Sequence, residues 1–159
     1  MNLEDIKKRL DYDPDTGLFT WNRKSGKVEA GVIGATGYLA IGIGKKIYKA
    51  HRLAWFMQHG EMPKCGIDHI NGNRLDNRIE NLRLANTSEN NQNRKVAHRN
   101  NKSGLLGVSM RRRNGEPRYF SARIRIDNKL ISLGSYPTAE LAHQAYLNAK
   151  RELHPFGTI

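Results

Sequence analysis

The 159-residue chain is long enough for one ordinary domain or for two small ones. Hydrophobic residues make up 38% of it and charged residues 26%, and no apolar run is long enough to cross a bilayer as a helix. The formal net charge of +12 is unevenly spread, with +7 on residues 99–159, and it favours a polyanionic partner such as nucleic acid.

Other features of the composition narrow the class further. Cys65 is the single cysteine, which excludes a disulfide within the chain and a Cys-x-x-Cys zinc site. The N-terminus carries acids at Glu4 and Asp5 and has no apolar signal-peptide core, so we expect a cytoplasmic protein. Basic charge can also serve solubility alone. A membrane surface is a less favoured partner, because the sequence contains no basic helix with a large apolar face.

Residues 1–64 predict a small β-rich region with a short helix near each end. Alternating apolar positions favour half-buried strands. Gly60 and Pro63 should end the second helix, because glycine suits a left-handed C-terminal position and proline cannot continue a helix. The expected elements are a helix over 3–10, a turn over 13–17, strands over 38–43 and 47–50, and a helix over 52–59.

Residues 65–98 contain the most informative pattern. A strand over 66–70, a turn and polar loop, and a second strand over 82–85 precede a helix from about residue 87 to residue 96. Asp68 and His69 are adjacent on the first strand, so a regular strand directs their side chains to opposite faces. An Asp-His pair by itself is usually structural and is a weak sign of function.

The wider set of polar residues in this stretch suits the cleavage of a phosphodiester. That reaction requires a water to lose its proton, negative charge on the phosphate to be offset, and the leaving oxygen to be stabilised. One imidazole and one hard divalent cation can supply all three effects. The run Asp68-His69-Ile70-Asn71-Gly72, with Asp76-Asn77, Glu80-Asn81-Leu82-Arg83 and Glu89-Asn90-Asn91, resembles the HNH nuclease motif in its variant with Asn in the last position.

The resemblance to HNH nucleases covers residues 66–95 and implies a ββα-metal hairpin that holds a single divalent ion. It implies that Asp68 and Asn90 are ligands of Mg²⁺ or Mn²⁺ through carboxylate and amide oxygens. It also implies that His69 is the general base, a role that the ordinary imidazole pKa suits. Asn81 would brace the loop through hydrogen bonds to the backbone and keep His69 aimed.

Three asparagines leave these roles partly open. Asn90 can instead be a capping or solvent-exposed amide. Asn91 is the second choice for the ligand role. Asn77 is the second choice for bracing the loop.

Two stretches further upstream are also seen in phage-type HNH proteins, so a looser resemblance covers residues 10–60. One is His51-Arg52-Leu53, and the other is the run Asp-Pro-x-Thr-Gly-x-Phe-x-Trp from Asp13 to Trp21. The resemblance indicates a phosphate contact for Arg52. For His51 we favour packing or a helix start over catalysis, since a lone histidine more often packs or hydrogen-bonds.

A second module is expected from Gly104, after a basic linker over 99–103. Alternation predicts three strands within 108–133, with a tight turn at Asp127-Asn128. Thr138 should cap a helix that covers the sheet. Its expected apolar stripe is Ala142, Ala145, Tyr146, Ala149 and Leu153.

The uncovered face of this predicted sheet should be rich in arginine. Arginines contact phosphates and guanine edges, and a sheet can enter the major groove. The alternative is a solvated face without a ligand. The expected DNA-binding residues of this module are Arg111, Arg113, Arg123, Arg125 and Lys129.

Residues 104–149 resemble the plant ethylene-response-factor (APETALA-type) DNA-binding domain. The matching features are Gly107-Val108, Phe120-x-Ala122-x-Ile124, Leu133-Gly134-x-Tyr136, Thr138-Ala139-x-x-Ala142 and Ala145-Tyr146. In that family three strands read the major groove and one helix packs behind them. Phe120 stands where tryptophan is usual and the arginine pattern differs, so a target sequence does not transfer.

Together these patterns predict an α+β protein with an HNH nuclease domain over 1–98 (motif core 66–96), the linker, and a DNA-binding domain over 104–159. The expected function is a metal-dependent, homing-endonuclease-like phosphodiester hydrolase that acts on double-stranded DNA. By family resemblance it would leave 5′-phosphate and 3′-hydroxyl ends. We expect a monomer or weak dimer with no membrane partner. The rival hypotheses are a non-catalytic DNA-binding regulator and an RNA-binding protein.

Overall fold

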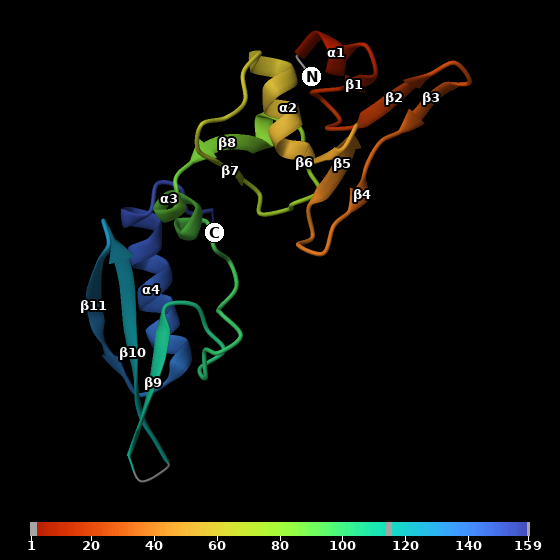
Figure 1. The fold of residues 1–159 in the computed structure, drawn as a ribbon. Coiled ribbons are helices and arrows are strands. Elements are labelled where there is room, and N and C mark those ends of the chain that lie inside the picture. Colours follow the sequence, from red (N-terminus) through yellow and green to blue (C-terminus); the bar gives the residue numbers. More distant parts are fainter. Residues whose placement is uncertain (1–2, 114–115, 159) are drawn as a thin grey trace. The chain divides into compact units, whose positions relative to one another are not determined.

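The computed structural model describes residues 3–113 and 116–158 of the chain (Figure 1). Short helices and small antiparallel sheets alternate along the sequence, which confirms the α+β class. The chain divides into two compact units, Met1–Asn86 and Thr87–Ile159, and each has its own architecture. None of the helices in the described ranges combines the length and the apolar character needed to span a membrane.

The first unit is built from small antiparallel sheets that surround the helix α2. The predicted strands over 38–43 and 47–50 are confirmed as β5 and β6, whereas β1 to β4 were not predicted as separate strands. The elements are α1 (Leu3–Lys7), β1 (Leu10–Tyr12), β2 (Phe19–Arg23), β3 (Gly26–Glu29), β4 (Val32–Ile33), β5 (Leu39–Ile43), β6 (Lys46–Lys49), α2 (Ala50–His59), β7 (Gly66–His69), the 3-10 helix η1 (Ile79–Asn81) and β8 (Leu82–Ala85).

The core of the first unit forms where apolar residues of the strands meet α2. Ile41 and Ile43 alternate inward along β5 and are 0% and 4% exposed. They belong to one buried cluster with Leu53 of α2 and Phe19 of β2. Gly60 ends α2 with φ 80°, and its N–H donates to a carbonyl of the last turn, as the sequence predicted.

The helix α1 is shorter than the predicted helix over 3–10. Leu10 leaves the helix and enters β1, where it pairs with Trp21 of β2. Leu10 is fully buried in this position. Pairing and burial of this residue in the sheet therefore outweigh the continuation of a short helix, which is marginally stable by itself.

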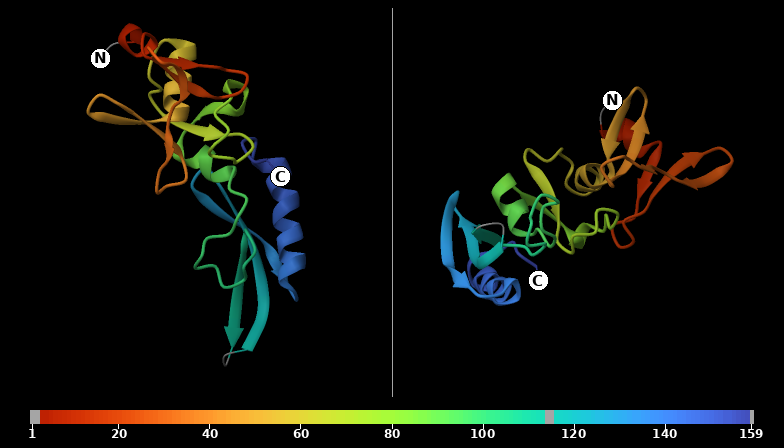
Figure 2. Two further views of the ribbon diagram at one scale, coloured as in Figure 1. Left: turned by 90° about the vertical axis from the view of Figure 1, so that its right-hand side faces the viewer. Right: turned by 90° about the horizontal axis from the view of Figure 1, so that it is seen from below.

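The second unit is an antiparallel sheet in the order β11-β10-β9 with one long helix, α4, along one face (Figures 1 and 2). Asp127 and Asn128 have φ of 46° and 63°, the left-handed pair typical of a two-residue hairpin turn. The Thr138 hydroxyl accepts a hydrogen bond from the N–H of Leu141 and caps α4. The elements are α3 (Thr87–Gln92), β9 (Val108–Arg113), β10 (Glu116–Ile126), β11 (Lys129–Tyr136) and α4 (Ala139–Leu153).

The buried side of α4 departs from the predicted stripe at its C-terminal end. Leu153 is 42% exposed, whereas Lys150 and His154 are buried. Lys150 Nζ donates to the carbonyl of Arg94 at 2.8 Å, and His154 Nε2 lies 2.9 Å from the carbonyl of Arg125. Backbone partners offset the cost of burying these polar groups, which an apolar pattern does not reveal.

Gly107 allows the start of β9 to lie directly under α4. Its φ is +77°, and a Cβ at this position would lie 2.0 Å from Cδ2 of the Tyr146 ring. A larger residue therefore does not fit without moving the helix or the strand.

The polar stretch before β9 is bonded to the second unit. Asn93 Oδ1 accepts from the hydroxyl of Thr158 at 2.6 Å. Asn101 Nδ2 donates to the carbonyls of Leu105 and Val108 at 2.9 and 3.1 Å. As a result, the compact division of the chain falls before α3, upstream of the basic stretch over 99–103.

Candidate functional site

The hairpin β7–β8 positions the two residues on which the predicted chemistry depends. Asp68 pairs with Arg83 and His69 pairs with Leu82, in a regular antiparallel register. Successive residues of a regular strand point to opposite faces, and the two side chains do have different neighbours. Asp68 is 5% exposed and His69 is 4% exposed, so both are held within the fold of the first unit.

The carboxylate of Asp68 forms a buried ion pair across the hairpin. Arg83 donates to Asp68 Oδ2 from Nε at 3.0 Å and from Nη2 at 2.7 Å. The two side chains are 6% and 23% exposed, so their attraction offsets the cost of removing them from water. Arg83 stands within the sequence motif, but no local pattern predicted this pairing with Asp68.

His69 lies in a cluster of rings that the sequence did not predict. The His51 ring stands edge-on to it, with centroids 5.0 Å apart and an interplanar angle of 85°. The Tyr38 ring lies 5.0 Å from His51 and 5.8 Å from His69. Packing was the favoured interpretation of His51, and its burial agrees with that, but its place beside the predicted base could not be read from the pattern.

Burial keeps both imidazoles of this cluster neutral near pH 7. It lowers the pKa of His69 below its ordinary value, although the Asn77 side chain and the nearby acids Asp68 and Asp76 oppose the shift. Burial, with a smaller contribution from His69, lowers the pKa of His51 to about 3. A neutral imidazole can accept a proton, which is the state that a general base requires.

Two cations gather over the Tyr38 ring on the other side of this cluster. Lys49 Nζ lies 4.6 Å and Arg74 Cζ lies 5.0 Å from the ring centroid. Such positions are favourable because the face of an aromatic ring carries negative partial charge. Two positive side chains on a ring that packs beside His69 suit an anionic ligand such as a phosphate, and neither stood out in the sequence.

Asn81 spans the loop that follows β7. Its Oδ1 accepts from the N–H of Asn71 at 2.9 Å, and its Nδ2 donates to the carbonyl of Asp76 at 2.8 Å. Its own carbonyl accepts from the N–H of Ile70 at 2.9 Å. Three backbone bonds from one buried residue restrict the loop directly after His69.

Asp76 is the electrostatic centre of the same loop. It accepts from Nε of Arg78 at 2.9 Å and from Nδ2 of Asn71 at 2.7 Å. These donors, with Arg78 the largest contribution, lower the pKa of Asp76 from 3.8 to about 2. The ionised carboxylate is therefore the form that the folded loop prefers.

The Asp76 interaction predicts a loss of stability in acid. Because the folded-state pKa is below the unfolded value, the stabilisation is complete above about pH 4 and is lost as the pH falls toward about 2. The Asp76→Asn variant should lower the free energy of unfolding by about 1–2 kcal/mol at neutral pH and by much less near pH 2. Urea unfolding at both pH values measures this, and a difference independent of pH would contradict the prediction.

Arg52 has a structural role in the first unit. Its guanidinium donates to the carbonyl of Pro63 at 2.7 Å and to that of Cys65 at 3.1 Å. These bonds hold the connection between α2 and β7. Because two of its donors are occupied by the backbone, Arg52 is better placed to hold this connection than to contact phosphate as the sequence suggested.

Asn90 and Asn91 lie on α3, which belongs to the second unit. Both side chains are exposed there. Within the described residues, no group of three or more His, Cys, Asp and Glu side chains is close enough to hold a metal ion. A metal site that uses an asparagine amide does not require such a group, because the amide oxygen is itself a ligand.

The outer face of the second unit's sheet carries three of the predicted arginines, Arg111, Arg123 and Arg125. Arg111 pairs with Tyr119 on β10 and is exposed, and Arg123 is partly buried. Arg125 is exposed and donates to the carbonyl of Asn128 at 2.9 Å. The side chain of Arg113 lies outside the described residues. Lys129 pairs with Ile126, so strand alternation places it on the opposite face, at the end of the hairpin.

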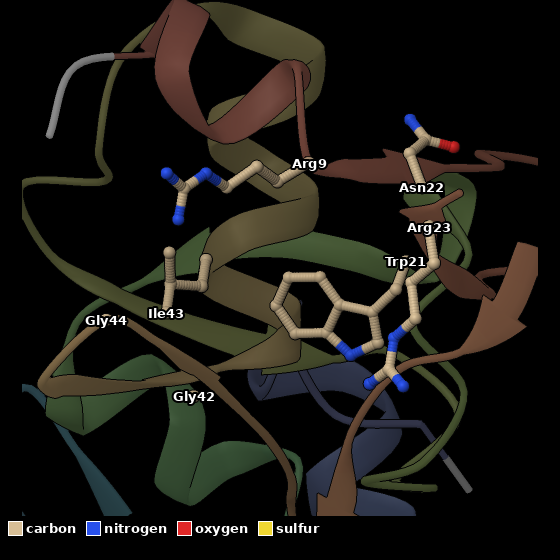
Figure 3. Close-up of a pocket in the computed structure, with 7 residues that line it drawn as sticks. All are labelled: Arg9, Trp21, Asn22, Arg23, Gly42, Ile43 and Gly44. Atoms are coloured by element: carbon tan, nitrogen blue, oxygen red, sulfur yellow. The ribbon is translucent and has the colours of Figure 1, made fainter. Parts of the chain in front are cut away.

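A shallow hollow in the first unit contains none of the predicted site residues. The indole of Trp21 lies between the side chains of Arg9 and Arg23 (Figure 3). Gly42, Ile43 and Gly44 complete most of its lining. Among the described residues, two of its lining side chains are basic and none is acidic.

Comparisons with known proteins agree with the hairpin chemistry. Residues 48–92, which include α2, β7, η1, β8 and α3, match the model of a family described as HNH endonuclease. The chain is 35% identical over 114 residues to Protein 3.8 of Escherichia phage T7, an alignment that covers 69% of this chain and 90% of that protein. No solved structure matches the chain. The chain therefore contains an HNH endonuclease domain over residues 48–92 and is a relative of Protein 3.8 of Escherichia phage T7.

Proposed function

We propose that this protein is a metal-dependent endonuclease that hydrolyses phosphodiester bonds of double-stranded DNA, as phage homing endonucleases do. The observation that carries the proposal is the hairpin β7–β8, which holds the carboxylate of Asp68 and the neutral imidazole of His69 at adjacent positions. The match of residues 48–92 to the HNH endonuclease family supports the same chemistry. The family resemblance extends the proposal to 5′-phosphate and 3′-hydroxyl products and to action in the cytoplasm of a host cell.

In this proposal His69 takes the proton from the attacking water. Its burial lowers its pKa and keeps it ready to accept that proton at neutral pH. Lys49 and Arg74, gathered on the Tyr38 ring, neutralise phosphate charge beside it. Asn81 restricts the loop and so preserves the direction of the His69 side chain.

Asp68 and Asn90 are the proposed ligands of one Mg²⁺ or Mn²⁺. A carboxylate and an amide oxygen suit a hard cation that keeps several of its waters, so the donor set fits the metal. When bound, such a cation would stabilise the negative charge that develops on the phosphate and on the leaving oxygen. Arg83 already balances Asp68, and this arrangement keeps the carboxylate in place within the protein.

Cleavage of a supercoiled plasmid tests the function directly. With Mg²⁺ the protein should convert the plasmid to open-circular or linear form. Chelation should slow this by about 100-fold or more, since a metal supplies several kcal/mol of transition-state stabilisation. Restored cleavage after Mg²⁺ is added back is the control, and equal cleavage with and without chelator would remove the metal from the proposal.

The second unit is proposed to bind duplex DNA through the outer face of its sheet. The resemblance to the APETALA-type domain supports this, together with the exposed guanidinium groups of Arg111 and Arg125 and that of Arg123. Arg113 is a further candidate for a phosphate contact, and Lys129, on the opposite face, could contact DNA only beside the end of the hairpin. The protein is proposed to act as a monomer or weak dimer.

Replacing Arg111 and Arg123 together by alanine should weaken DNA binding roughly tenfold and lower the slope of log affinity against log salt by about 0.9 per lost phosphate contact. The measurement is fluorescence anisotropy with labelled duplex DNA, in a His69→Ala background that prevents cleavage. Arg151→Ala is the matched control, because this exposed arginine lies on α4 and pairs with Asn148. Equal losses of DNA affinity in the double variant and in Arg151→Ala would contradict a specific role for the sheet face.

The alternative function is a non-catalytic DNA-binding regulator with a structural hairpin. The specific observation in its favour is that Asp68 is already neutralised by Arg83. DNA binding without any Mg²⁺-dependent cleavage would support this alternative. A preference for duplex RNA over duplex DNA would favour the remaining rival, since the deep, narrow A-form major groove does not admit a sheet.

A further inference from the structure

Asn77 is the single buried residue among residues 70–78, in the loop between β7 and η1. It is 1% exposed, and its Oδ1 lies 3.5 Å from Nε2 of His69. Its Nδ2 donates to the carbonyl of Leu75 at 3.1 Å. Sequence patterns placed Asn77 only second to Asn81 as a bracing residue.

The bond to Leu75 decides which way the Asn77 amide faces. A flipped amide would bring its oxygen against the Leu75 carbonyl oxygen, where neither atom can donate. The amide oxygen therefore faces His69, and it can only accept a hydrogen bond. This favours the imidazole tautomer that carries its proton on Nε2 and its lone pair on Nδ1.

We propose that Asn77 is a positioning residue that holds His69 in the Nε2–H tautomer, so that Nδ1 is the nitrogen that accepts the proton from water. This inference rests on the proposed function, in which His69 is the general base. The separation of 3.5 Å is long for a hydrogen bond, as is common for catalytic contacts before substrate binds. The edge-on ring of His51 packs against the same imidazole and limits its rotation.

Asn77 is itself held by the N-terminal segment of the chain. The Tyr12 hydroxyl donates to the carbonyl of Asn77 at 2.8 Å, across 65 positions of sequence. The Tyr12 ring stacks on Phe19 with centroids 4.7 Å apart. Two residues beyond Asn77, the N–H of Ile79 donates to the carbonyl of Pro14 at 3.1 Å. The turn at 13–17 therefore lies directly against the loop that contains Asn77.

Gly17 makes this close approach possible. Its φ is +74°, and a Cβ there would lie 2.5 Å from the N of Arg78 and 2.7 Å from the carbonyl carbon of Asn77. Since both contacts are to backbone atoms, the loop would have to move to accept any side chain. We therefore assign the Asp-Pro-x-Thr-Gly-x-Phe run the role of supporting the Asn77 backbone and, through it, His69.

The tautomer can be measured without metal or DNA. Long-range ¹H–¹⁵N spectra of the intact protein at about pH 8, where an ordinary imidazole is neutral, report which ring nitrogen carries the proton. The His69 signals are those that disappear in His69→Ala. We expect the Nε2–H tautomer in the parent and a mixture of tautomers in Asn77→Ala.

Kinetics provide the second readout. Asn77→Ala should lower kcat for plasmid cleavage by about 10–100-fold, with KM within about twofold, since loss of a residue that orients a catalytic group typically has this effect. Tyr12→Phe removes only the hydroxyl that holds the Asn77 carbonyl, and should lower kcat by about 3–10-fold. Thermal unfolding of each variant shows whether it remains folded at the assay temperature.

Gly17→Ala and Gly60→Ala form a matched pair. Both glycines have similar φ, +74° and +80°, but a Cβ at Gly60 would meet nothing within 4 Å. Both variants therefore carry similar backbone strain, and only Gly17→Ala displaces the loop. We expect a fall in kcat of about tenfold for Gly17→Ala and little change for Gly60→Ala.

The outcomes separate this inference from the proposed function. An unchanged His69 tautomer in Asn77→Ala would overturn the positioning role, whatever the activity of that variant. Full cleavage by His69→Ala would instead show that His69 is not the general base. The tautomer measurement would then still test whether Asn77 sets the tautomer of His69. A changed tautomer together with a reduced kcat and an unchanged KM supports both.

Discussion

Replacing His69 by alanine is expected to lower the rate of Mg²⁺-dependent plasmid cleavage by about 1,000-fold, within the range that a general base contributes. The imidazole is 4% exposed, and burial lowers its pKa, so it is in the neutral, proton-accepting form at neutral pH. Duplex DNA binding should be retained, because binding depends mainly on phosphate contacts elsewhere. Single-turnover cleavage and fluorescence anisotropy measure the two quantities.

The His69→Ala experiment has a matched control in the first unit. His59 is an exposed histidine at the end of α2, where it packs on the ring of Trp55. His59→Ala should cleave at nearly the parental rate. Cleavage by His69→Ala at the rate of His59→Ala would withdraw the catalytic assignment and leave the DNA-binding regulator as the better description.

Replacing Asp68 by asparagine should produce the second largest effect, a fall in cleavage of about 100-fold or more, together with weaker Mn²⁺ binding. The same change removes the partner of Arg83, so the free energy of unfolding should fall by about 2–4 kcal/mol. Cleavage is measured over a Mg²⁺ titration, Mn²⁺ binding by electron paramagnetic resonance, and stability by urea unfolding.

The Arg83→Met variant separates the metal role of Asp68 from its structural role. This variant also breaks the ion pair, so it should be destabilised to a similar degree, but it keeps the carboxylate. If Asp68 is a ligand, Arg83→Met should bind Mn²⁺ at least as tightly as the parent, because a competing cation is gone. Equal loss of Mn²⁺ binding in both variants would show that the pair is needed only for the fold.

Local patterns in the sequence were sufficient for the elements that carry the site. The strands β7 and β8, the end of α2 at Gly60, the turn at Asp127-Asn128 and the cap at Thr138 all depend on residues close to each other in sequence. Alternation of apolar residues, left-handed backbone positions and side-chain capping determine where these elements form and where they end. For the same reason, opposite directions for Asp68 and His69 followed from strand geometry alone.

The main differences between the sequence predictions and the structure concern polar side chains with backbone partners. Lys150 and His154 continue the buried side of α4 because backbone carbonyls receive them, and an apolar pattern cannot show such partners. Arg52 also has backbone partners that its sequence neighbours do not reveal, since its guanidinium donates to the carbonyls of Pro63 and Cys65 across a loop. In each case the partner is distant in sequence or is a backbone atom, which has no residue type to recognise.

The sequence by itself determined the α+β class, the hairpin with Asp68 and His69, the bracing position of Asn81 and the basic character of the second unit. Only the tertiary structure decided what surrounds the imidazole: His51 edge-on, the Tyr38 ring with Lys49 and Arg74 above it, and the Asn77 amide. The physical reason is that periodicity and capping act over a few residues. The environment of a buried imidazole, by contrast, depends on packing between segments up to 65 positions apart, such as Tyr12 and Asn77.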